Sequence, residues 1–154
     1  MRCWRVLVQW LPLAIAGCAQ QPADSGVSPR LLLADIYWAF TGETYSSVDE
    51  FKKGVSDYHE SLNIESKWRP DEIAIEEPSL RVLYVYWEGD EQLDATVDLV
   101  ADDGQRFSTA ELIFKLHNAV VHRLRDHDAV FFEGLIFEPS AKDASATCTL
   151  QLGS

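Results

Sequence analysis

The chain has 154 residues, of which 47% are hydrophobic, and it carries 25 acidic against 13 basic residues, a formal net charge of −12. This is enough apolar sequence for one domain with a buried core, which excludes a disordered chain, and three cysteines are too few for a disulfide scaffold. The negative charge argues against nucleic acid as a partner and against docking on an anionic membrane through a basic face.

The first 17 residues have the properties of a secretory signal. Arg2 and Arg5 give a positively charged start, and Val6 to Ala16 follows as an apolar run of eleven residues. A membrane-spanning helix needs about 20 residues, so this run is too short to remain as an anchor. Its length and its charged start are typical of exported proteins, and residues 1–17 are therefore expected to be removed.

The end of this signal carries a more specific pattern, Ile15-Ala16-Gly17-Cys18. It resembles the lipobox of bacterial lipoproteins, in which an aliphatic residue and two small residues precede a cysteine. The resemblance implies that the Cys18 thiol is acylated with diacylglycerol and that cleavage just before it leaves a chain anchored in the membrane by this lipid. In such lipoproteins an Asp after the cysteine favours retention in the inner membrane. Here Ala19 follows Cys18, so the resemblance implies an anchor in the outer membrane and a domain that faces the periplasm. An ordinary signal peptide with a chance cysteine, or an internal start, is the alternative.

Behind the lipid, residues 18–29 form a polar tether rich in Gln, Ser, Gly and Pro, and residues 30–154 form one globular domain. The signal removes one of the three cysteines and lipid occupies Cys18, so Cys148 is the only thiol of the domain and no internal disulfide is expected. Alternate residues from Ala146 to Leu152 are small or apolar and share one strand face. This pattern predicts that Cys148 is a buried hydrophobe rather than a reactive thiol.

An eight-residue pattern occurs twice. Gly42-Glu-Thr-Tyr-Ser-Ser-Val-Asp49 recurs as Gly104-Gln-Arg-Phe-Ser-Thr-Ala-Glu111, with a glycine, an aromatic residue, a serine and an acid at matching positions. The pattern predicts a turn followed by a capped helix start, with Ser46 and Ser108 as the N-caps. A duplicated unit and convergent capping chemistry explain the repeat equally well.

The helices that follow are predicted from apolar periodicity. Residues 48–62 place their apolar side chains on one stripe, whereas residues 109–125 are apolar around more than half of the circumference, which predicts the central core helix. Six segments are strand candidates: 35–40, 72–76, 80–87, 95–101, 130–137 and 147–152. The resulting order predicts an α+β fold, a single domain with a largely antiparallel sheet and two helices packed on one face, as two βαββ units in tandem would give.

One face of this sheet is expected to be open and aromatic. If residues 130–137 alternate regularly and Gly134 lies under a helix, then Phe131, Glu133, Leu135 and Phe137 share the opposite face. Either Tyr84 and Tyr86, or Val85 and Trp87, lie on the same face, and the two tyrosines are taken with the four residues above as the partner-binding set. The alternative is that the apolar segment 30–40 covers this face as part of the core.

The acidic residues concentrate between Asp71 and Asp103, where eleven acids accompany a single base, Arg81. Such a region would attract a partner with a basic surface and accelerate its association. The alternatives are a solvated acidic rim that aids solubility and a calcium site near residues 88–94, although the spacing there is not that of an EF-hand loop.

Catalytic patterns are absent or weak, and no metal site or cofactor is predicted. No nucleophile elbow, zinc helix, cysteine pair or phosphate loop occurs. His117 and His122 lie about 140° apart on the predicted helix, so they cannot share a metal ion. His117 falls within the apolar arc and therefore needs a polar partner, for which Glu133 is the nearest candidate by sequence; a structural role is favoured over a role in a site.

These features together predict a protein-binding domain without enzymatic activity, tethered to the outer membrane by the lipid on Cys18. An acidic rim beside an aromatic face suits a stoichiometric inhibitor of a protein with a basic surface. In size, charge and export the chain is similar to immunity proteins against periplasmic toxins, although no motif is shared. A small-molecule or metal-binding domain using His117 and Glu133, and an envelope assembly factor, are the alternatives.

Overall fold

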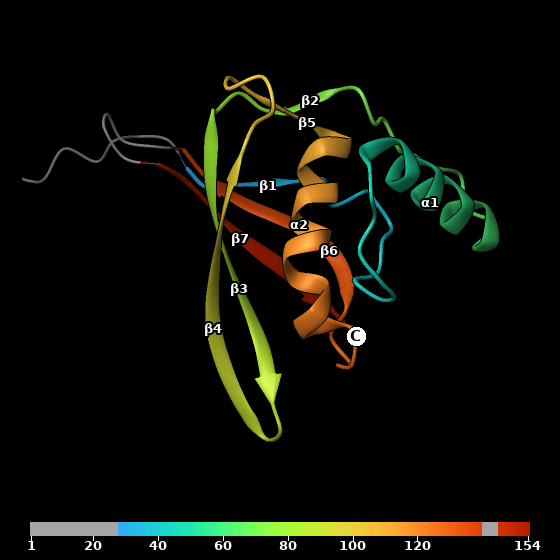
Figure 1. The fold of residues 1–154 in the computed structure, drawn as a ribbon, viewed down its shortest axis with the longest axis vertical. Coiled ribbons are helices and arrows are strands. Elements are labelled where there is room, and N and C mark those ends of the chain that lie inside the picture. The colour runs from blue at the N-terminus through green and yellow to red at the C-terminus, as the bar shows by residue number, and fades with distance from the viewer. Residues whose placement is uncertain (1–27, 140–144) are drawn as a thin grey trace, which may run out of the picture.

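The computed structural model describes residues 28–139 and 145–154, so the signal, Cys18 and the tether up to residue 27 lie outside the described residues. The chain forms one α+β domain (Figure 1). In chain order the elements are β1 (Arg30–Leu32), α1 (Val48–Ser61), β2 (Ile73–Ile75), β3 (Ser79–Glu88), β4 (Glu91–Val100), β5 (Phe107–Ser108), α2 (Thr109–Leu124), β6 (Phe131–Glu138) and β7 (Ala146–Gly153).

The main sheet has five strands in the order β1-β6-β7-β3-β4, and all its pairs are antiparallel except β3 and β7. β2 and β5 form a separate two-stranded sheet. α2 lies against the main sheet, and α1 packs on α2 and on the irregular segment before it (Figure 1). The predicted fold class is therefore confirmed, with both helices on the same side of a largely antiparallel sheet.

The predicted strand at residues 35–40 is wrong. The first strand is Arg30–Leu32, and the later segment makes only an isolated bridge between Ala39 and Phe131. Its side chains nevertheless alternate, because Ile36, Trp38 and Phe40 are buried on the helix side of the sheet. The alternation of apolar residues here therefore reflects burial of every second side chain in the core, and it does not require pairing with a neighbouring strand.

The two capped turns differ in detail. Ser108 caps α2 as predicted, but α1 is capped by Ser47, whose hydroxyl accepts from the Glu50 amide, while Ser46 instead donates its amide and hydroxyl to the Glu50 carboxylate. The elements that follow also differ, because α1 leads into the separate sheet through β2 whereas α2 leads into the main sheet through β6. What the two copies share is local capping chemistry.

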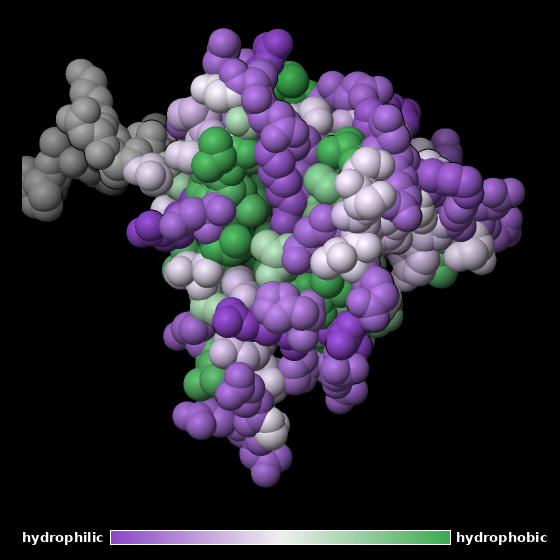
Figure 2. All heavy atoms as spheres, in the orientation of Figure 1, coloured by the Kyte–Doolittle hydropathy of each residue, from purple (hydrophilic) through white to green (hydrophobic). Residues whose placement is uncertain are grey.

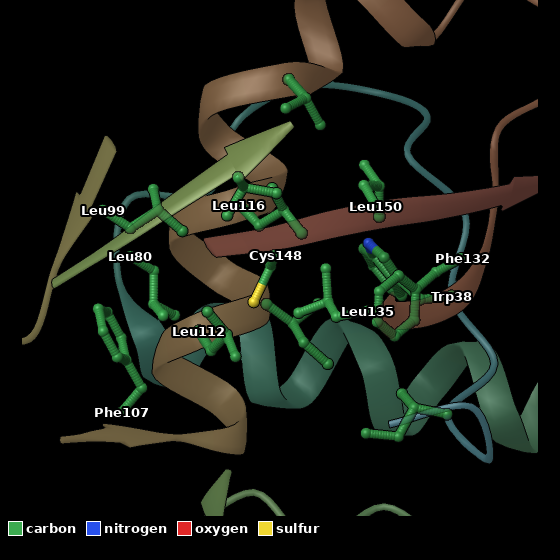
Figure 3. Packing of buried hydrophobic residues seen from close by; sticks show 14 of the residues in the cluster. Trp38, Leu80, Leu99, Phe107, Leu112, Leu116, Phe132, Leu135, Cys148 and Leu150 are labelled. Carbon is green, nitrogen blue, oxygen red and sulfur yellow. The ribbon is translucent and has the colours of Figure 1, made fainter. Parts of the chain in front are cut away.

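The core lies between the main sheet and α2, with Cys148 near its centre (Figure 3). Leu80, Leu112, Leu116 and Leu135 surround the thiol, which is fully buried. Burial raises the pKa of Cys148 to about 12, because a thiolate would lack water there. The prediction that Cys148 is buried as a small hydrophobe is confirmed.

Candidate functional site

The face of the main sheet opposite α2 is not covered by any element of residues 28–139 and 145–154. Its register places an uncharged row of side chains across all five strands, because each residue of the row is the cross-strand partner of the next. From edge to edge the row is Leu31, Ile136, Thr149, Leu83 and Thr96. We call this surface, together with Val85 and Trp87 further along β3, the open face.

The most apolar part of the open face belongs to β3. Leu83 and Trp87 are 39% and 42% exposed, and Val85 between them is half-buried. A hollow of about 340 Å³ lies beside them, lined also by Asp94 and Thr96 of β4. Exposed large apolar side chains in a row on an uncovered sheet are typical of surfaces that bind another molecule.

Next to this hollow the sheet parts into two wings. β3 and β7 pair only from Leu80 to Leu83 with Ala146 to Thr149; beyond that point β3 continues beside β4 and β7 continues beside β6. Figure 1 shows the β3–β4 hairpin running away from β7. The parting leaves a cleft of about 290 Å³. One wall is formed by residues 85–87 of β3 and the other by residues 149–152 of β7. Leu124 at the end of α2, and His127 and Ala129 in the loop that follows it, complete the lining. The hollow and the cleft share Val85 and Thr149, so they form one continuous depression.

Acidic residues surround the outer end of this depression. Glu88, Asp90 and Glu91 form the tip of the β3–β4 hairpin, which Figure 2 shows to be hydrophilic. Asp126 and Asp128 line a neighbouring hollow that shares Trp87, His127 and Ala129 with the cleft. Within the described part of the chain, no basic side chain forms an ion pair with the three hairpin acids or with Asp128. The negative charge at this end is therefore only partly offset, by Arg123 acting on Glu88 and by the ion pair of Arg125 with Asp126.

The prediction that Leu135 and Phe137 lie on the open face is wrong. β6 contains a bulge between Phe132 and Gly134, so that the alternation of its side chains restarts after Glu133. Leu135 and Phe137 consequently face the core, where they are 0% and 4% exposed. Phe131, which precedes the bulge, and Glu133, which lies in it, remain exposed as predicted.

The choice of Tyr84 and Tyr86 for the open face is also wrong. Tyr84 is buried beneath α2, where its hydroxyl accepts a hydrogen bond of 2.8 Å from Arg123, and the Arg123 guanidinium lies 5.0 Å from the centre of the Tyr86 ring. Val85 and Trp87, the other members of the alternation, are the pair that faces away from the helices. The alternative in which residues 30–40 cover the open face is not realised either, because Trp38 and Phe40 pack on the helix side.

Sequence reasoning missed Leu83 and the row it belongs to, but one signal marked them. Arg81 has the same parity in β3 as Leu83, Val85 and Trp87, and a lone arginine in an otherwise apolar strand belongs on the solvent side. In the structure Arg81 indeed lies on the open face, where it binds Asp98 of β4 through two hydrogen bonds of 2.8 and 3.2 Å.

His117 is a structural residue, and the predicted contact with Glu133 is wrong. Its Nδ1 accepts a hydrogen bond of 3.2 Å from the Trp38 indole, and its Nε2 donates to the carbonyl of Glu43 at 3.0 Å. The indole can only donate, so this pairing requires the neutral tautomer with the proton on Nε2. Glu133 lies on the exposed side of the far strand β6 and takes no part in these bonds. Both ring nitrogens are thus used by the fold.

The burial of His117 predicts a dependence of stability on pH. Desolvation lowers the pKa of His117 from its ordinary value of 6.5, and a protonated ring would turn a second N–H toward the indole N–H. Since the unfolded chain takes up this proton first, the free energy of unfolding should be constant above about pH 7 and should fall as the pH drops below about 6.5. Urea unfolding between pH 7 and 5 measures this slope. The His117→Gln variant should be less stable at pH 7 but should show a smaller slope, and an unchanged slope would contradict the assignment.

A second buried histidine escaped the sequence analysis. His59 of α1 is 2% exposed, with Nε2 at 2.6 Å from the carbonyl oxygen of Tyr37 and Nδ1 at 2.6 Å from the Ser66 hydroxyl. His59 and His117 therefore both fasten the segment between β1 and α1 to the helices, through the carbonyls of Tyr37 and Glu43. The apolar stripe of α1 suggested no polar contact at this position, because the partners are main-chain and loop groups remote in sequence.

Other kinds of site find no support in the described residues. No group of three or more His, Cys, Asp or Glu side chains within residues 28–139 and 145–154 is placed to hold a metal ion. No helix in the same ranges is long and apolar enough to cross a membrane. Comparison with protein-family models, with curated proteins and with solved structures finds no match for this chain.

Proposed function

We propose that this chain is a membrane-tethered, non-enzymatic binding protein whose open face takes a protein partner with a basic surface. The observation that carries the proposal is the uncovered sheet face itself, with Leu83, Val85 and Trp87 exposed or half-exposed beside a depression. The acids at the end of the β3–β4 hairpin, which form no ion pair in the described residues, supply the charge that would guide a basic partner to this face. The stoichiometric inhibitor expected from the sequence is one protein of this kind.

The shape of the depression favours a protein over a small molecule. Sites for small ligands are concave cavities of about 300–1,000 Å³ that enclose most of the ligand. The hollow and the cleft measure about 340 and 290 Å³ and share Val85 and Thr149. Beside them Leu83 and Trp87 stand exposed on the sheet, outside any enclosing cavity, and such a row suits contact with a larger surface.

The tether of the proposal rests on the lipobox at Cys18. Replacing Cys18 by Ser removes the only acceptor for the lipid, so the protein should move from the membrane fraction to the soluble fraction of the cells that make it. Fractionation followed by immunoblotting measures this shift. Membrane association that is unchanged in the variant would contradict the lipid anchor while leaving the binding role untouched.

The binding role is tested by substitution of one exposed aromatic residue. The tagged full chain and its Trp87→Ser variant are used to capture proteins from envelope and secreted fractions of the source cells, with quantitative mass spectrometry as the readout. A partner of the open face should be captured at least about tenfold less by the variant, because a buried aromatic anchor contributes 2 kcal/mol or more to binding. Its capture by the unaltered chain should also weaken as salt is raised.

Tyr37→Ser is the matched control. Tyr37 is 55% exposed and lies beside His59 of α1, on the helix side of the sheet. This variant loses an exposed aromatic ring of similar accessibility, so it should capture the partner as the unaltered chain does. Equal capture by all three proteins, or equal loss in both variants, would contradict the assignment of binding to the open face.

A further inference from the structure

The cleft between β3 and β7 exposes two strand edges at once. β3 pairs with β4 along its whole length, but it pairs with β7 only as far as Leu83. β7 pairs with β6 as far as Gly153, but it pairs with β3 only as far as Thr149. Residues 85–88 and 151–153 therefore each have one edge without a main-chain partner in the described structure. Unpaired N–H and C=O groups along a strand edge are a template for another strand.

The geometry of the two edges suits insertion of a strand between them. β3 and β7 are parallel and in register where they touch, and they diverge only beyond Leu83 and Thr149. An extended segment that entered at this point would bond to both edges and would continue the sheet across the gap. Its alternate side chains would then point toward the open face and toward the apolar base formed by Leu124 and Ala129.

The charge around the cleft selects the occupant. Glu88, Asp90 and Glu91 stand on the hairpin side, and Asp126 and Asp128 stand on the side of the loop after α2. Arg125 pairs with Glu43 and, at 3.8 Å, with Asp126, and the charge of Arg123 acts on Glu88 while its guanidinium binds the Tyr84 hydroxyl. Asp90, Glu91 and Asp128 are left without an ion pair in the described residues. A second copy of this chain would bring the same acidic rim against itself, at a net charge of −12 per copy. The occupant that this setting favours carries Lys or Arg.

We propose that an extended, Lys- or Arg-rich segment of a partner protein adds as a strand between β3 and β7, with its basic side chains toward the acids of the hairpin and of the loop after α2. This inference rests on the proposed function and specifies how part of the partner is recognised. Main-chain hydrogen bonds to the two edges supply the affinity, and the acidic rim together with the apolar base supplies the selectivity.

A short synthetic peptide in which Lys alternates with Val serves as the probe. Its binding to the full chain in neutral detergent is followed by amide hydrogen exchange in NMR spectra. We expect exchange to slow at least about tenfold for those amides of residues 85–88 and 151–153 that point into the cleft, because strand addition gives these groups new partners. The same peptide with Glu in place of Lys should not bind, and a version with N-methylated Val residues, which lacks half of the amide donors, should bind at least about tenfold more weakly.

The Glu peptide and the N-methylated peptide are the matched controls, the first for charge and the second for main-chain pairing. No binding of the Lys peptide, equal binding of the Glu peptide, or equal binding of the methylated peptide would each overturn the inference.

The two proposals fail separately. If a partner is captured through Trp87 but the Lys peptide shows none of the expected protection, strand addition is wrong and the binding role of the open face stands. If the peptide binds in the cleft but no protein depends on Trp87 for capture, strand addition stands and the assignment of protein binding to the open face is wrong.

Discussion

Phe137→Asp should abolish the folded domain, whereas Phe131→Asp on the same strand should leave it folded. Phe137 is 4% exposed in the core beneath Arg30, whose guanidinium lies 5.6 Å from the ring centre, and Phe131 is 45% exposed before the bulge. Removing a buried phenylalanine costs about 3–5 kcal/mol, and a carboxylate in its place adds the cost of an unpaired charge. Since whole domains are stable by only about 5–15 kcal/mol, Phe137→Asp should be unfolded.

Circular dichroism and urea unfolding of the two variants measure the difference. Phe131→Asp should lose no more than about 1 kcal/mol, because its side chain is already in contact with water. A folded Phe137→Asp variant would mean that the ring faces solvent, and it would return Leu135 and Phe137 to the open face. Loss of the fold in both variants would contradict the exposed position of Phe131.

Gly134→Ala should destabilise the domain by about 2–4 kcal/mol. The residue has φ of +123° at the bulge of β6, a conformation that costs a side chain about 1–3 kcal/mol, and an added Cβ would lie 2.7 Å from the carbonyl oxygen of Leu32. That oxygen belongs to the main chain of β1, so relief of the contact requires β1 to shift away from β6. Thermal or urea unfolding gives the magnitude.

Gly153→Ala is the matched control for this substitution. A Cβ at Gly153 meets only the side chain of Glu133, which is exposed and can rotate away, and the backbone there is not in the left-handed region. Its stability should change by no more than about 0.5 kcal/mol. Equal effects of the two substitutions would show that the bulge does not require glycine at position 134.

The helices and most strands were predictable because their signals are local. The apolar periodicity of residues 109–124 and the serine with its acid three residues later define α2 without reference to the rest of the chain. β2, β3, β4, β6 and β7 likewise coincide with predicted segments to within a few residues at each end. The segment 35–40 failed because burial against helices produces the same alternation as a strand does.

The candidate site was harder to predict, because it depends on two features that are not local. The bulge at Glu133 and Gly134 reverses the orientation of every later residue in β6, and a glycine in a strand indicates either a bulge or close packing without deciding between them. The parallel pairing of β3 with β7 joins segments more than 60 residues apart, and the cleft exists only because this pairing stops early. Arg81 was the one local sign of which face of β3 meets solvent.

Some of the acidic residues that lack ion-pair partners gather at one place in the described structure. Of the acids from Asp71 to Asp103, four pair with lysine or arginine side chains of the domain: Asp71, Asp98, Asp102 and Asp103. The acids at the tip of the β3–β4 hairpin have no such partners in the described residues, and they stand next to Trp87 and the cleft. Aromatic surface and free negative charge therefore meet at one end of the molecule, where the two proposals place the partner.

The central claim is that the open face is covered by a partner in the cell, and oxidative footprinting of Trp87 tests it most directly. Hydroxyl radicals are generated around intact cells and around the purified full chain, and oxidation of Trp87 and of Tyr37 is quantified by mass spectrometry. We expect Trp87 to be oxidised several-fold less in cells than in the purified protein, while Tyr37 reacts equally in both. Equal oxidation of Trp87 in the two settings would contradict the claim.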